Sequence, residues 1–70
     1  MNNSLKELGL RVKTLREERG WTQHECAAFI GMHQSTVAHI ESGDRNITMA
    51  TLDQLVRGFG ITFEELFEGM

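Results

Sequence analysis

The sequence predicts an all-α protein made of five short helices. Apolar residues recur in steps of three and four, the spacing that places side chains on one face of a helix. A Ser or Thr followed three residues later by Glu, the pattern typical of a helix start, stands at the beginning of three of these helices. No segment alternates apolar and polar residues over the length of a strand.

The first helix is expected to cover residues 4–19 and to end at Gly20. Ser4 and Glu7 form a possible capping box, in which each side chain would accept a hydrogen bond from the backbone N–H of the other residue. The stripe that would face the core contains Leu5, Leu8, Val12 and Leu15.

The second and third helices are expected on either side of a glycine turn. Thr22 and Glu25 form a second possible capping box, and Gly31 can take the left-handed conformation that closes a helix. The third helix follows residues 32–33 and runs through Glu41.

Two further helices complete the chain. Thr48 can cap a fourth helix that runs to Gly58, and Thr62 with Glu65 opens a short fifth one. Their apolar positions are expected in the core: Leu52, Leu55, Val56, Phe59, Ile61, Phe63, Leu66 and Phe67.

Length and charge narrow the function. A chain of 70 residues supports one domain, residues 1–70. Its net charge of −3 argues against DNA binding, because phosphate contacts need Lys or Arg. However, residues 1–40 carry five basic and four acidic groups, whereas residues 41–70 carry two and six. An acidic segment more than about 10 Å from DNA would be largely screened.

Several classes of protein are disfavoured. Cys26 is the single cysteine and cannot form an internal disulfide, and no secretion signal or membrane-spanning run is present, so we expect a cytoplasmic protein without a membrane partner. The histidines lack the spacing of a helical metal pair. No nucleophile with an adjacent base is apparent, so we expect no enzyme activity, metal or cofactor.

The spacing over residues 22–42 predicts a helix-turn-helix. Counted from Gln23, the positions of Ala27, Gly31, Val37 and Ile40 follow in steps of four, four, six and three. The small Ala27 suits the closest approach of two crossing helices, and Val37 and Ile40 would point inward. Gln34, Ser35, Ala38 and His39 would then form a small, polar outer face suited to the major groove.

These residues resemble the lambda-repressor and Cro-like family of helix-turn-helix regulators, also called the XRE type. The resemblance covers nearly the whole chain, through RVKTLREERGWTQHECAAFIG, STVAHIESG and TLDQLVRGFGITFEELF. It implies the five-helix lambda-repressor-like fold and sequence-specific binding of double-stranded DNA. Asp44 makes the loop before the fourth helix less basic than in many relatives.

The resemblance also implies roles for individual residues. Base contacts are expected from Gln34, Ser35 and His39, with His33 at the edge of the recognition helix. Phosphate contacts are expected from Gln23, Thr36, Arg45 and Asn46. Arg16 and Glu41 match a structural ion pair between the first and third helices. Among the basic residues of the first helix, Arg11 is the best phosphate candidate.

The sequence therefore predicts a transcriptional regulator that binds a palindromic operator as a homodimer. The expected dimer surface lies within residues 59–70 and contains Phe63, Leu66, Phe67 and Met70. The alternative is a helix-turn-helix interaction module, or an antitoxin-like partner of a regulatory protein, in which DNA binding is secondary.

Overall fold

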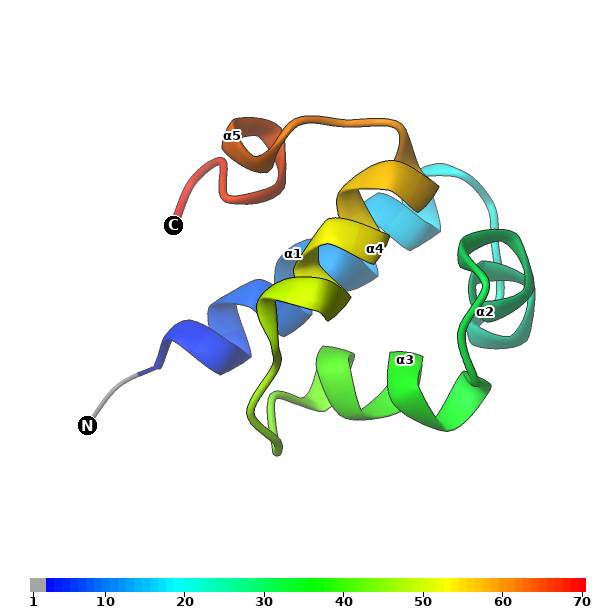
Figure 1. Ribbon diagram of the computed structural model, residues 1–70, viewed down its shortest axis with the longest axis horizontal. Helices are drawn as coiled ribbons and strands as arrows, with labels where there is room; N and C mark the ends of the chain where they lie inside the picture. Colours follow the sequence, from blue (N-terminus) through cyan, green and yellow to red (C-terminus); the bar gives the residue numbers. More distant parts are fainter. Residues whose placement is uncertain (1–2) are drawn as a thin grey trace.

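The computed structural model describes residues 3–70 and has five α-helices within them and no strand. The helices are α1 (Ser4–Glu18), α2 (Gln23–Ile30), α3 (Gln34–Ser42), α4 (Met49–Phe59) and α5 (Phe63–Leu66). The predicted all-α class and helix order are confirmed. Helix α3 packs against both α1 and α2, α4 packs against α2, and α5 packs against α1, at the opposite edge of the molecule from α3 (Figure 1).

Three of the four predicted threonine or serine caps are present. The hydroxyl groups of Thr22, Thr48 and Thr62 each accept a hydrogen bond from the backbone N–H three residues later. The carboxylates of Glu25 and Glu65 in turn accept the N–H of Thr22 and Thr62, each at 2.9 Å, so both of these capping boxes are complete.

The capping box predicted for the first helix is wrong. The N-cap of helix α1 lies one residue earlier than the pattern indicated, at Asn3, and Ser4 is the first helical residue. The N–H of Glu7 donates to the Asn3 carbonyl oxygen at 3.0 Å, as in an ordinary helical turn. Glu7 is then four residues from the cap, outside the spacing that a capping box needs.

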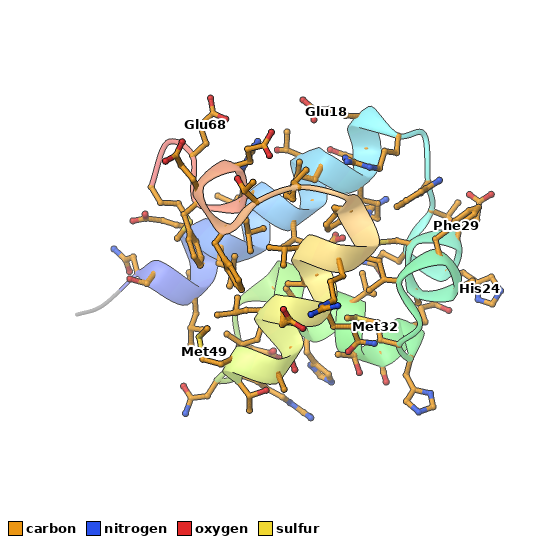
Figure 2. The ribbon with its side chains drawn as sticks, turned by 45° about the horizontal axis from the view of Figure 1, so that its top comes forward. Glu18, His24, Phe29, Met32, Met49 and Glu68 are labelled. Carbon is orange, nitrogen blue, oxygen red and sulfur yellow. The ribbon has the colours of Figure 1, made fainter. Side chains whose placement is uncertain are left out.

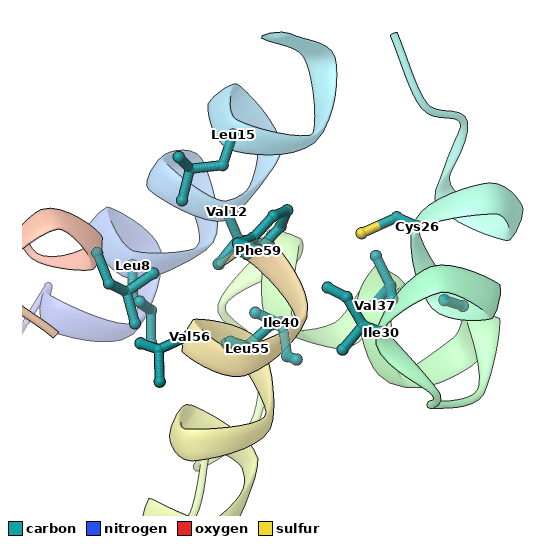
Figure 3. Close-up of a cluster of buried hydrophobic side chains, with 12 residues drawn as sticks. Leu8, Val12, Leu15, Cys26, Ile30, Val37, Ile40, Leu55, Val56 and Phe59 are labelled. Atoms are coloured by element: carbon teal, nitrogen blue, oxygen red, sulfur yellow. The ribbon is translucent and has the colours of Figure 1, made fainter. Parts of the chain in front are cut away.

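The core is one cluster of apolar side chains drawn from all five helices (Figure 3). No polar or charged residue among those described is buried. Cys26 is fully buried, and burial raises the pKa of its thiol. The buried residues are Leu8, Val12, Leu15, Cys26, Ala27, Ile30, Val37, Ile40, Leu55, Val56, Phe59 and Leu66.

Helix α1 and the end of α3 approach closely because two positions lack a side chain. A Cβ atom on Gly9 would lie 2.5 Å from the carbonyl oxygens of Ile40 and Glu41. A Cβ atom on Gly43 would lie 2.8 Å from Cα of Lys6. This contact holds α3, the predicted recognition helix, against the rest of the fold.

Within residues 3–70, no helix is long and apolar enough to cross a bilayer. In the same part of the chain, no three His, Cys, Asp or Glu residues lie close enough together to hold a metal ion.

Candidate nucleic-acid interface

Helices α2 and α3 are joined by the tight turn that the sequence predicts. Gly31 has φ 88° and its N–H donates to the Ala27 carbonyl oxygen at 2.8 Å. The N–H of Met32 donates to the same oxygen at 3.0 Å. Gln54 of α4 adds a contact that sequence reasoning missed, because its Nε2 donates to the Gly31 carbonyl oxygen at 2.8 Å. Helix α4 therefore holds the turn in place.

The polar residues predicted to read bases lie on the outer side of α3. His33, Gln34 and Ser35 are exposed, whereas Val37 and Ile40 are buried beneath them. Because the two buried positions orient the helix, the polar face is left open to a ligand.

His39, on the same helix, is half-buried and has a partner that the sequence did not indicate. Its Nδ1 lies 3.2 and 3.3 Å from the two carboxylate oxygens of Asp44. The pKa of Asp44 is lowered, most of all by a hydrogen bond from the Ser42 side chain. The contact with His39 and the positive charge of Arg45 lower it further. Asp44 is therefore a carboxylate near neutral pH.

The ion pair predicted between Arg16 and Glu41 is present and nearly buried. Arg16 Nε and one terminal nitrogen donate to the two carboxylate oxygens of Glu41 at 2.7 and 3.1 Å. The side chains of Arg16 and Glu41 are 12% and 5% exposed, and their hydrogen bond raises the pKa of Arg16. The other terminal nitrogen of Arg16 donates to the Trp21 carbonyl oxygen at 2.8 Å, just before α2 begins.

Gln23, the first residue of α2, joins this network. Its Nε2 donates to Oε1 of Glu41 at 3.2 Å. One carboxylate therefore ties α1, α2 and α3 together. The second hydrogen of the Gln23 amide stays available to another acceptor.

Three residues predicted to bind phosphate line one hollow with His39. Its volume is about 140 Å³, and it lies between α3, the loop after it and the start of α4. Arg45 is its one basic side chain apart from His39 and is exposed. The lining residues are Thr36, His39, Ile40, Arg45, Asn46, Ile47, Thr48 and Thr51.

Arg11 does not lie with this group. Its Nε and a terminal nitrogen donate to the Glu65 carbonyl oxygen at 3.3 and 2.9 Å, and that terminal nitrogen lies 3.7 Å from Glu68. The side chain is 21% exposed. Arg11 therefore fastens α5 to α1, and two of its three guanidinium nitrogens are engaged with α5 and Glu68.

The C-terminal apolar residues divide into buried and exposed. Leu66 is fully buried in the core, which corrects its predicted place on a dimer surface. Phe63 and Phe67 are each 37% exposed and stack with ring centroids 6.4 Å apart, and Met70 is 46% exposed. Leu66 is excluded from the surface because α5 packs on α1 through it, leaving its neighbours outside. We call Phe63, Phe67 and Met70 the C-terminal apolar surface.

Comparison with known proteins agrees with this geometry. A family model described as "Helix-turn-helix" matches residues 12–66. The Control protein C.MunI of a Mycoplasma species is 35% identical over 68 residues, which cover 96% of this chain and 92% of that protein. Antitoxin HipB of Escherichia coli K12 is 30% identical over 56 residues, covering 80% of this chain and 64% of that protein. Depending on the relative, the chain spans from 35% to 92% of the curated protein's length.

A solved structure is also similar. The restriction-modification controller protein C.Esp1396I, a tetramer in complex with its natural 35-base-pair operator, superposes with a TM-score of 0.85 at 25% identity. The match covers 97% of this chain and 90% of that one. The chain therefore belongs to the XRE-type helix-turn-helix family of DNA-binding transcription regulators.

Proposed function

We propose that this protein is a sequence-specific transcriptional regulator that places α3 in the major groove of double-stranded DNA. The open polar face of α3, beside the hollow that contains Arg45, carries this proposal. An α-helix fits the width of the major groove, where side chains can reach base edges.

The proposed contacts are of two kinds: contacts to bases, which select the sequence, and contacts to phosphates, which position the protein on DNA. Gln34, Ser35 and His39 contact bases, with His33 at the N-terminal edge of α3. Gln can bond an adenine through two hydrogen bonds, whereas Ser and His make single bonds. Thr36, Arg45 and Asn46 contact phosphate beside α3, and Gln23 does so from the first turn of α2 with its free amide hydrogen.

The acidic balance of the chain is compatible with this orientation. Three of the ten acidic groups lie at the C-terminal end of the chain: Glu64 and Glu65 in α5, and Glu68 two residues after it. Helix α5 lies at the opposite edge of the molecule from α3 (Figure 1). The molecule measures 32 × 23 × 22 Å, and charges more than about 10 Å apart are largely screened at moderate salt.

We further propose that the operator is palindromic and is bound by a homodimer. A single α3 reads few bases, and two copies in adjacent major grooves, roughly 34 Å apart, would double the contacts. The C-terminal apolar surface is the proposed dimer contact. The tetrameric assembly of C.Esp1396I on its operator supports pairing of similar chains on DNA.

Mobility shifts with fragments of the host genome at two salt concentrations test this function. We expect a small set of fragments to bind far more tightly than the rest, with affinity falling as salt rises. Equal binding of all fragments would refute the proposed function as a sequence-specific regulator.

The similarity to Antitoxin HipB favours a second candidate, a helix-turn-helix protein whose main ligand is a protein partner. In that case, the chain would show little preference among DNA fragments, and a protein encoded beside it would bind with higher affinity than any fragment.

A further inference from the structure

The contact between His39 and Asp44 bears on which bases α3 can select. The two residues are five positions apart, and the Nδ1 atom of His39 faces both carboxylate oxygens of Asp44. The side chains are 35% and 55% exposed, so both border the surface that the proposed function assigns to DNA.

The chemistry of Asp44 determines where the proton of the imidazole lies. An ionised carboxylate only accepts hydrogen bonds, so a nitrogen that bonds to it must carry a hydrogen. In a neutral imidazole, one nitrogen carries the hydrogen and the other is an acceptor. With Nδ1 donating to Asp44, Nε2 is the acceptor.

Among the residues that the structure describes, those that line the hollow beside His39 include no competing carboxylate. The hollow beside His39 is lined by hydroxyl, amide, aliphatic and guanidinium groups, and the guanidinium of Arg45 is a hydrogen-bond donor. Asp44 is therefore the group that distinguishes the two ring nitrogens.

We propose that Asp44 is a positioning residue that makes His39 present Nε2 to the major groove as a hydrogen-bond acceptor. An acceptor pairs with the amino groups of adenine N6 or cytosine N4, and not with guanine O6 and N7 or thymine O4. His39 would thus select adenine or cytosine at one position of each half-site. This selection rests on the proposed placement of α3 in the groove.

The tautomer can be measured without DNA. ¹⁵N spectra of the His39 ring at about pH 8, above the ordinary imidazole pKa of about 6.5, report which nitrogen carries hydrogen. We expect the Nδ1–H form in the wild type. We expect Asp44→Ala to shift the ring toward Nε2–H. A wild-type ring with hydrogen on Nε2 would overturn the proposal.

Selection from randomised half-sites then tests the consequence. The wild type should prefer adenine or cytosine at one position by roughly fivefold, the value of one net hydrogen bond. Asp44→Ala and His39→Ala should both lose that preference, and combining them should cause no further loss. Asp53→Ala, which removes an equally charged carboxylate paired with Arg57 on α4, should keep it.

Two results would contradict the inference while leaving the proposed function intact. One is an Asp44→Ala protein that keeps the wild-type base preference, and the other is a wild-type preference for guanine or thymine that His39→Ala removes. A wild type that selects no sequence at all would instead refute the proposed function, and with it base selection by His39, whatever the tautomer.

Discussion

Glu41 shows how one side chain can organise a small domain. Its carboxylate receives two hydrogen bonds from Arg16 and one from Gln23, so α1, α2 and α3 meet at a nearly buried charge. Such pairs return little net free energy once desolvation is counted, but leaving one partner unpaired is costly. The pair therefore fixes the orientation of the helices more than it stabilises them.

Removing either partner of this pair should destabilise the fold. We expect Arg16→Met and Glu41→Leu each to lower the free energy of unfolding by about 3 kcal/mol, because the remaining charge would be buried alone. The double variant should lose clearly less than the sum of the two. Urea unfolding of the four proteins measures this, and strictly additive losses would show that the two charges do not interact.

Gln34 and Arg45 should affect DNA binding in different ways. Gln34→Ala should relax the preference at one base pair by about 1 to 3 kcal/mol, because it removes a base contact. Arg45→Ala should weaken binding to every sequence alike and reduce the dependence on salt, because it removes a phosphate contact.

Competition binding with single-base operator variants at two salt concentrations separates these effects. Arg11→Ala is the control, since its guanidinium is bonded to Glu65 on the far side of α1 and should leave base preference unchanged. Identical profiles for the Gln34 and Arg45 variants would contradict the proposed docking of α3.

At the scale of helices, stability depends on caps and on close packing. Helix α2 starts with a complete capping box formed by Thr22 and Glu25. Hydrogen bonds from the backbone of Thr22, the larger effect, and from its side chain lower the pKa of Glu25 below its ordinary value of 4.5. A carboxylate with a lowered folded-state pKa stabilises the fold above the unfolded-state pKa. That stabilisation is lost as the pH falls through the folded-state pKa.

Acidification should therefore weaken the fold partly through Glu25. We expect the urea midpoint of the wild type to fall as the pH drops below about 4.5 and that of Glu25→Gln to fall less, since glutamine does not titrate. Glu17→Gln, at an exposed position outside the capping boxes, is the control and should follow the wild type. Parallel curves for all three proteins would show that the capping carboxylate is not linked to folding.

Gly9 should be required for the packing of α1 on α3. Alanine is a better helix former by about 1 kcal/mol, but here its Cβ would lie 2.5 Å from two backbone oxygens of α3. We expect Gly9→Ala to destabilise the fold by about 1 to 3 kcal/mol, because the helices must move apart. Thr14→Ala, at an exposed position of the same helix, should be neutral or stabilising. Chemical unfolding of both variants tests this, and a more stable Gly9→Ala protein would contradict the close approach.

At the scale of the whole molecule, the two proposed contact surfaces lie apart. The outer face of α3 is at one edge and α5 is at the other, with α1 and α4 between them (Figure 1). Phe29 is a further exposed aromatic, 67% exposed, and it extends from α2 with its ring stacked on Trp21 at 4.7 Å (Figure 2). Replacing Phe29 is therefore a control for the loss of an exposed aromatic ring that lies outside the C-terminal apolar surface.

Replacing Phe63 and Phe67 together by serine should convert a dimer to a monomer and weaken operator binding. The two rings supply most of the C-terminal apolar surface, and burying apolar area stabilises an interface by about 25 cal/mol per Å². Sedimentation velocity reports the mass, and circular dichroism checks that the helices persist. Phe29→Ser should stay dimeric. If the double variant kept the wild-type mass, the dimer contact would lie elsewhere.

The sequence alone determined the features that depend on neighbours within one or two helical turns. Helix order and most of the core stripe follow from spacings of three and four residues, because those spacings define a helical face. The caps at Thr22, Thr48 and Thr62 and the left-handed Gly31 follow from the residue types at the helix ends. Family resemblance added the pair between Arg16 and Glu41, which are 25 positions apart.

Only the tertiary structure decided the features that depend on which helix ends meet. Arg11 bonds to a carbonyl 54 positions away, and Gln54 to one 23 positions away, distances over which periodicity carries no information. Whether Leu66 faced inward depended on how α5 settles on α1. The pairing of His39 with Asp44 depended on the path of the loop after α3, because a side chain takes its partner from the packed chain around it.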